Sequence, residues 1–117
     1  MSTPYDPRKS SATAEVVADF CRSDIAADDD IKNVPGVGDA VQDVLRDNGI
    51  DTIAQLLAKF LEQIDGARDT SGVCQAFYDY MKGIVKGTSA ARVNIHTPTF
   101  AMANYASEKG LFEYELR

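Results

Sequence analysis

Cysteine, histidine and long apolar runs are scarce in this sequence, and each scarcity excludes a class of protein. The two cysteines, Cys21 and Cys74, form no CxxC pair, and there is a single histidine, so neither a disulfide framework nor a zinc site is expected. The sequence instead predicts free thiols in a reduced, intracellular protein. No apolar run approaches the ~20 residues of a transmembrane helix, and the first residues lack the apolar centre of a signal peptide. We therefore expect a soluble protein that is not secreted and has no membrane span.

Positive charge is also in short supply. Lysine and arginine together number 12 against 18 aspartates and glutamates, which gives a formal net charge of -6 and a pI of about 4.6. A surface that is basic throughout, as many nucleic-acid-binding proteins have, is therefore excluded. No nucleophile with a neighbouring base, no carboxylate pair and no cluster of metal ligands stands out in the sequence. We expect a protein that is not an enzyme and that needs no cofactor or metal.

Apolar residues recur at helical spacing along most of the 117 residues. Since 44% of the residues are hydrophobic, the chain can bury one modest core. We expect an all-α fold, a compact bundle of about five helices, because strand-like alternation is nearly absent. Residues 1–10 are predicted to form a flexible N-terminal arm, and residues 11–117 a single helical domain.

Three of these helices carry clear signals at an end or along a face. Ser11 is expected to cap the first helix, with Val16 on its apolar face. Over residues 53–64, apolar residues recur at three- and four-residue steps, so this helix is expected to be the central helix of the core. Thr97 is expected to cap the last helix, with Pro98 in its first position, where the missing N–H costs nothing.

Residues 31–48 predict two short helices joined by a tight hairpin. Pro35, Gly36 and Gly38 stand where the chain reverses, because glycine takes backbone angles that other residues reach only with strain. The second helix is expected to start near Asp39, so the hairpin amides lie at the positive end of its dipole, which favours an anionic oxygen. A tight turn between helices, without a ligand, is the alternative interpretation.

An acidic run precedes this stretch and contains Asp24, Asp28, Asp29 and Asp30. Because the run lacks the glycine and the distal glutamate of a calcium-binding loop, it is not expected to bind a metal. We expect it to solvate a loop and to place negative charge at the first turn of the next helix.

The order of these segments resembles the barrier-to-autointegration factor family, small helical proteins that contain a helix-hairpin-helix motif. The resemblance omits residues 93–98, which look like an insertion, and it is carried by four anchors: Asp19-Phe20, Gly36-Val37-Gly38, Leu56-Leu57 and Phe60-Leu61. It implies a SAM-like helical bundle with the helix-hairpin-helix at residues 31–48. It also implies a homodimer that bridges double-stranded DNA without reading its sequence, a location in the nucleus on chromatin, and nuclear protein partners.

The DNA contacts implied by the resemblance fall into two groups. Both groups are expected to contact the phosphate backbone. The first group lies in the hairpin and consists of Pro35, Gly36, Val37, Gly38 and Ala40. The second group follows a later helix and consists of Lys86, Ser89 and Arg92. The second group lies in residues 80–107, which include no acidic residue. An ordinary basic face on an acidic protein is the other interpretation of that window.

The chain also departs from the family pattern. Where family members have lysines, it has Val16 and the pair Asp43-Val44, and Asp39, Asp43 and Asp47 follow at four-residue steps. Such a carboxylate row repels phosphate if it lies near the backbone of DNA. The alternative function is therefore a helical protein-interaction module of the same fold, with weak or lost DNA binding.

Overall fold

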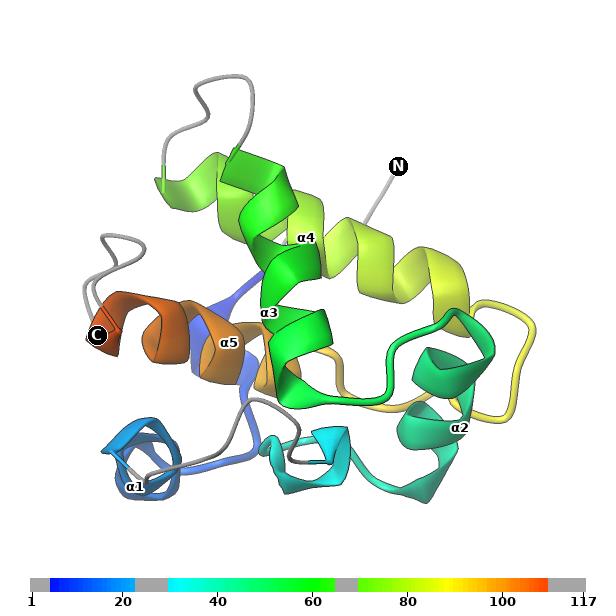
Figure 1. Cartoon of the computed structure of the whole chain (residues 1–117), viewed down its shortest axis with the longest axis horizontal. Helices are drawn as coiled ribbons and strands as arrows, with labels where there is room; N and C mark the ends of the chain where they lie inside the picture. Colours follow the sequence, from blue (N-terminus) through cyan, green and yellow to red (C-terminus); the bar gives the residue numbers. More distant parts are fainter. Residues whose placement is uncertain (1–4, 23–29, 65–69, 110–117) are drawn as a thin grey trace.

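The last helix, α5 (His96–Glu108), lies at the centre of the protein. In this computed structural model, which describes residues 5–22, 30–64 and 70–109, every residue of α5 from His96 to Ala106 is buried. Four elements pack against α5: the 3-10 turn η1 (Pro7–Lys9), α1 (Ala14–Arg22), α3 (Ile53–Leu61) and α4 (Thr70–Val85) (Figure 1). The core is thus built around a helix that has no solvent-facing side over most of its length.

The prediction that residues 53–64 form the central helix of the core is wrong. α3 buries Ile53, Leu56 and Phe60, while its other side chains are partly or fully exposed, as expected of an amphipathic helix at a surface. α5 has small residues such as Ala101 and Ala103 between its large ones, so neighbours can approach it from all sides. A helix buried all round has no amphipathic period to detect.

Polar side chains inside α5 bond back to its own carbonyls. Thr99 Oγ1 donates to the Ile95 carbonyl (2.9 Å), and Asn104 Nδ2 donates to the Phe100 carbonyl (2.7 Å). These bonds satisfy groups that would otherwise be costly to bury. The predicted cap at Thr97 is wrong, because α5 begins two residues earlier than expected, at His96, with Ile95 as an N-cap that makes no side-chain bond.

The beginning of α1 also differs from the expectation. Thr13 caps it, since Thr13 Oγ1 accepts from the Val16 N–H (3.2 Å) and the Thr13 carbonyl accepts from the Val17 N–H (3.1 Å). Val16 does not belong to the apolar face, because it is 50% exposed, whereas Val17 is fully buried. The inner face of α1 meets α5 through Phe20, whose ring lies 5.1 Å from that of Tyr105.

Two further elements precede α3: the 3-10 turn η2 (Ile31–Asn33) and α2 (Asp39–Asp47). The 3-10 turn η3 (Glu62–Ile64) follows α3, and the described residues contain five α-helices and no strand. The all-α expectation is therefore confirmed for a compact fold with a Cα radius of gyration of 12.9 Å. A single 3-10 turn stands where the first helix of a helix-hairpin-helix was expected, so the structure does not identify that motif.

Glycines and a capping box fix the ends of the outer helices. Gly49 follows α2 with φ of 80°, and Gly87 follows α4 with φ of 76°, the left-handed conformation that terminates a helix. Thr52 caps α3 and exchanges side-chain and backbone hydrogen bonds with Gln55. In the parts of the chain that the structure describes, no helix has the length and apolar character that crossing a membrane requires.

Candidate functional site

The hairpin before α2 is a β-turn of residues 34–37. The Val37 N–H donates to the Val34 carbonyl (3.0 Å), and Gly36 has φ of 90°. Proline in the second position and a left-handed glycine in the third are the signature of a type II turn. The Val37 amide is therefore used inside the turn, and its side chain is buried in the core, so Val37 shapes the hairpin without presenting a group to a ligand.

Gly36 joins this turn to the first turn of α5. A Cβ placed on Gly36 would lie 2.7 Å from Pro98 Cδ and 2.8 Å from Thr97 Cβ. Glycine is thus required here both for its backbone angle and for the close approach of α5. The contact places the hairpin directly beside the point where residues 86–95 enter α5.

Gly38 differs from the expectation for the two hairpin glycines. Its φ of -94° and ψ of -172° are extended angles that any residue adopts, and no atom lies within 4 Å of a Cβ built on it. Gly38 is the N-cap of α2: its carbonyl accepts from the Gln42 N–H (2.9 Å), and it supplies no side-chain cap. The expectation that Gly38 takes angles special to glycine is therefore wrong.

The first turn of α2 presents backbone N–H groups to solvent. Within the described residues, the amides of Gly38, Asp39 and Ala40 meet no hydrogen-bond acceptor. Gly38 and Asp39 are exposed and Ala40 is half-buried. Unsatisfied amides at the positive end of a helix dipole favour an anion. This end of α2 is geometrically open to a phosphate oxygen.

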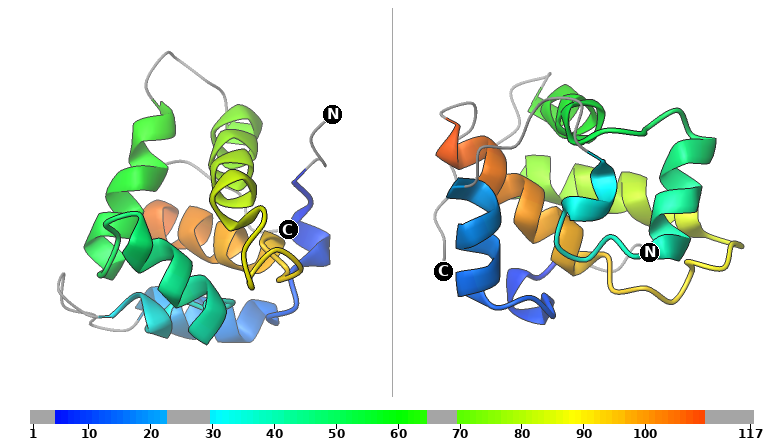
Figure 2. Two further views of the ribbon diagram at one scale, coloured as in Figure 1. Left: turned by 90° about the vertical axis from the view of Figure 1, so that its right-hand side faces the viewer. Right: turned by 60° about the horizontal axis from the view of Figure 1, so that its bottom comes forward.

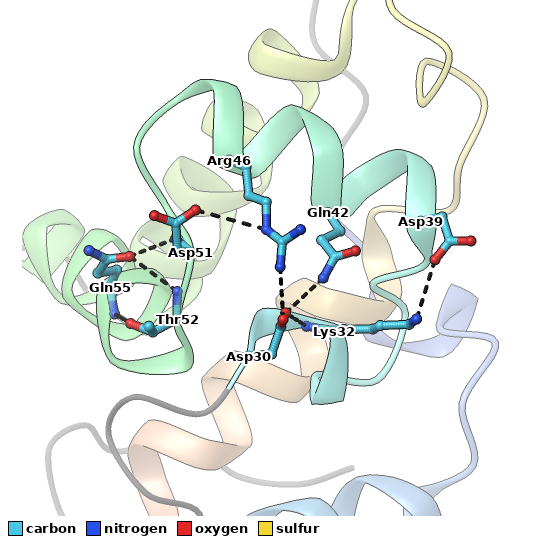
Figure 3. A network of polar contacts seen from close by, with 8 residues as sticks. All are labelled: Asp30, Lys32, Asp39, Gln42, Arg46, Asp51, Thr52 and Gln55. Atoms are coloured by element: carbon cyan, nitrogen blue, oxygen red, sulfur yellow. Dashed lines mark hydrogen bonds and ion pairs between the residues drawn. The ribbon is translucent and has the colours of Figure 1, made fainter.

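Asp30 ties the hairpin to α2 through a polar network (Figure 3). Its Oδ1 accepts from the Lys32 N–H (3.0 Å) and from Gln42 Nε2 (2.8 Å), and its Oδ2 accepts from Arg46 Nη2 (2.8 Å). The bond from the Lys32 amide, followed by that from Gln42, holds the pKa of Asp30 below its ordinary value. The sequence led us to expect that Asp30 solvates a loop and places negative charge at the first turn of the next helix; it does cap η2, but its bonds to Gln42 and Arg46 were not expected. The rest of its acidic run lies outside the described residues.

The network also determines the charge of the hairpin surface. Arg46 is shared between Asp30 and Asp51 (3.9 Å), and Lys32 Nζ lies 3.6 Å from Asp39 Oδ1. Both cations of this network, Lys32 and Arg46, are therefore paired. The carboxylates of Asp39, Asp43 and Asp47 are on exposed residues of α2, so the sides of this helix are negative while its N-terminal end is open.

Residues 86–95 bring the second predicted group to the same end of the molecule. This segment runs from α4 to α5 and passes alongside α2 (Figures 1 and 2). Lys86, Ser89 and Arg92 are exposed on it, while Ala90 is fully buried and anchors it. No ion-pair partner for Lys86 or Arg92 is present among the described residues. The segment that passes alongside α2 thus carries positive charge that is not paired within the described residues.

His96 is a structural residue. Its Nδ1 accepts from the Asp6 N–H (3.1 Å), and its Nε2 lies 3.3 Å from Tyr78 Oη. Because a backbone N–H can only donate, Nδ1 carries no proton, and the neutral ring holds its proton on Nε2. Burial lowers the pKa of His96, Lys9 lowers it further, Asp6 opposes this, and Lys82 adds a smaller lowering.

The cysteines are expected to be unreactive. Both are free and buried, and burial raises the pKa of Cys21 to about 11 and that of Cys74 to about 12. Over the chain segments that the structure describes, no three His, Cys, Asp or Glu side chains are grouped so that they could hold a metal ion.

The candidate site is the end of the molecule formed by the hairpin, the first turn of α2 and residues 86–92. Comparisons of this chain with protein-family models, with curated proteins and with solved structures found no match.

Proposed function

We propose that this protein binds the phosphate backbone of double-stranded DNA without reading its base sequence. One contact is made by the backbone amides at the first turn of α2, and a second is made by Lys86, Ser89 and Arg92. The proposal is carried by one observation: the hairpin before the uncapped first turn of α2 contacts the start of α5, and the segment that leads into α5 passes alongside α2 with Lys86 and Arg92 exposed on it (Figures 1 and 2).

The two contacts differ in what they contribute. Amides at Gly38 and Ala40 donate to a phosphate oxygen and are aided by the helix dipole, so this contact works even in a chain with a net charge of -6. Lys86 and Arg92 release counterions from DNA, which makes the affinity depend on salt. Neither contact reaches a base edge, so binding is independent of sequence.

The proposal includes assembly and location. The resemblance to the barrier-to-autointegration factor family supports a helix-hairpin-helix role for residues 31–48, with η2 in place of the first helix, and a nuclear location with nuclear protein partners. It also supports a homodimer, since a protein with one such site per copy must dimerise to bridge two duplexes. No catalytic step is part of this function.

Gly38→Glu tests the hairpin contact. The added carboxylate would stand beside the amides proposed to receive phosphate, and the open space around Gly38 leaves the fold unstrained. Affinity for a random-sequence duplex, measured by fluorescence anisotropy at two salt concentrations, should fall by about tenfold or more, equivalent to ~1.4 kcal/mol. Ala58→Glu, at an exposed position of α3 outside the candidate site, adds the same charge. This variant should bind DNA as the parent does.

A second function is favoured by the acidic face of α2. Asp39, Asp43 and Asp47 are exposed and would suit a basic protein partner better than DNA. If the parent protein retards no duplex even at low salt, the DNA proposal is wrong, and an interaction module of the same fold replaces it. If Gly38→Glu folds and binds as tightly as the parent, the hairpin is not the contact.

A further inference from the structure

Residues 5–12, named here the N-terminal strap, lie against α4, α5 and the segment between them. Four main-chain groups of the strap bond to side chains of that surface: the Tyr5 N–H to Gln75 Oε1 (2.7 Å), the Asp6 N–H to His96 Nδ1 (3.1 Å), the Lys9 carbonyl to Asn94 Nδ2 (2.6 Å) and the Ser11 N–H to Thr97 Oγ1 (2.9 Å). Of the arm predicted at residues 1–10, residues 5–10 are thus attached to α4, α5 and the segment between them. Residues 1–4 are not among the residues that the structure describes.

Aromatic packing adds to these bonds at one end of the strap. The Tyr5 ring lies 6.0 Å from the rings of both Tyr78 and His96, and the last two rings stack at 4.6 Å. At its other end the strap meets Thr97, the residue that Gly36 of the hairpin also approaches. The strap and the hairpin therefore flank the same turn of α5 (Figure 2).

The strap carries positive charge to the candidate site. Lys9 is exposed, and the Asn94 side chain that holds its carbonyl comes two residues after Arg92. Lys82 lies on the same side, with its Nζ 6.0 Å from the centre of the Tyr78 ring. Together with Lys86 and Arg92 of the candidate site, these two residues form what we name the basic surface: Lys9, Lys82, Lys86 and Arg92.

Two acidic residues on the same elements as the basic surface, Asp6 in the strap and Asp79 in α4, already have side-chain partners. Asp6 is bonded to Arg8 (3.2 Å), and Asp79 Oδ1 accepts from Gln75 Nε2 (3.0 Å). In the described parts of the chain, none of the four cations of the basic surface forms an ion pair. Folding thus gathers unpaired positive charge from three segments of a chain whose net charge is -6.

We infer that the N-terminal strap is part of the nucleic-acid interface, because its attachment fixes Lys9 beside residues 86–95 and so extends the basic surface along the phosphate backbone of a duplex. The inference rests on the proposed function for the nature of the ligand. Four cations drawn from the strap, α4 and the following segment suit a polymer of regularly spaced phosphates, which can meet them all at once. A single phosphate would meet one or two of them.

The salt dependence of binding tests this inference. Lys9→Ala with Lys82→Ala should make the plot of log affinity against log salt shallower by about 0.9 per lost phosphate contact, and equally so for duplexes of different sequence. Arg22→Ala with Lys59→Ala removes the same charge from α1 and α3, outside the basic surface, and should leave the slope unchanged. Helicity measured by circular dichroism confirms that each variant folds.

A second pair of variants separates attachment of the strap from its charge. Asn94→Ala removes the bond to the Lys9 carbonyl and the bond that Asn94 Oδ1 accepts from the His96 N–H (3.0 Å), but no charge. It should nevertheless make the salt dependence of the affinity shallower, and Lys9→Ala added to it should then change little. The outcomes distinguish the two contacts. If the salt dependence of Lys9→Ala with Lys82→Ala equals that of the parent while Gly38→Glu still loses binding, the strap inference fails and the proposed function stands.

If the salt dependence of that double variant becomes shallower while Gly38→Glu binds normally, the hairpin contact fails and the strap contact stands. No binding by the parent overturns both.

Discussion

Gly36 lies so close to Thr97 that a Cβ on the glycine would stand 2.8 Å from the Cβ of the threonine. Thr97 Oγ1, in turn, accepts from the Ser11 N–H at 2.9 Å. One buried residue of α5 thus contacts two segments that are far from it in the sequence and that both belong to the proposed interface. The positions of these two segments relative to each other therefore depend on the first turn of α5.

Gly36→Ala should destabilise the fold. The new methyl group would clash with Thr97 and Pro98, and the φ of 90° is itself unfavourable for alanine. We expect the free energy of unfolding to fall by ~1–3 kcal/mol, measured from urea denaturation curves. Gly38→Ala is the matched comparison, since Gly38 has φ of -94° and open surroundings, and its stability should change by about 0.5 kcal/mol or less. Equal losses in both variants would contradict the different roles assigned to these glycines.

Stability should decrease as the pH falls below about 6.5, the pKa of histidine in an unfolded chain. The folded state lowers the pKa of His96, mainly through burial, so the unfolded chain binds the proton more readily. The stabilisation is complete above pH 6.5 and is lost as the pH falls through the lower pKa of the folded state. Urea midpoints at pH 7.5 and 5.5 should show this loss.

His96→Gln provides the control for this pH dependence. His96 is the chain's only histidine, and no other side chain ordinarily titrates between these two pH values. The variant should therefore lose the decrease in stability between pH 7.5 and 5.5, although its stability at pH 7.5 also falls because the ring contacts are gone. An undiminished decrease in the variant would show that another group is responsible.

Asp39→Lys with Asp43→Lys should strengthen DNA binding several-fold, most clearly at low salt, where charges are least screened. Both residues are exposed on α2, and the network centred on Asp30 remains intact apart from the surface contact of Lys32 with Asp39. Glu15→Lys with Glu62→Lys makes the same change in net charge on other elements and serves as the comparison in anisotropy titrations. If the two double variants gain equally, this face of α2 does not approach DNA.

The purified protein should sediment as a dimer, because bridging by copies with one contact site each requires two of them. Sedimentation equilibrium over a range of concentrations measures the mass directly. A monomer mass at all concentrations would remove bridging from the proposed function and leave binding to a single duplex. A titration in which two differently labelled duplexes are captured together provides the functional check.

Patterns of local origin were predictable from the sequence. The start of α2 near Asp39 and the left-handed Gly36 were expected from residue types at short spacing, and both are present in the structure. Each depends on interactions within one turn, which the local sequence determines. The contact of Lys86, Ser89 and Arg92 with DNA stays a prediction; the structure shows that all three are exposed.

Features that depend on distant partners were not predictable. The central place of α5 follows from small residues accommodating other helices, and the attachment of residues 5–12 depends on side chains such as Asn94 and His96, far along the chain. Asp30 looked like one more acidic loop residue until folding brought Gln42 and Arg46 to it. No local pattern encodes such pairings.

The position of α5 has a consequence for how the chain acquires its structure during synthesis. Two helices made earlier, α1 and α3, pack against α5, which leaves the ribosome after them. Until residues 96–106 are available, the apolar faces of those helices have no central partner, so the usual order of folding from the N-terminus cannot yield a finished core. We expect the nascent chain to remain protease-sensitive up to that point and to become resistant in one step once α5 emerges.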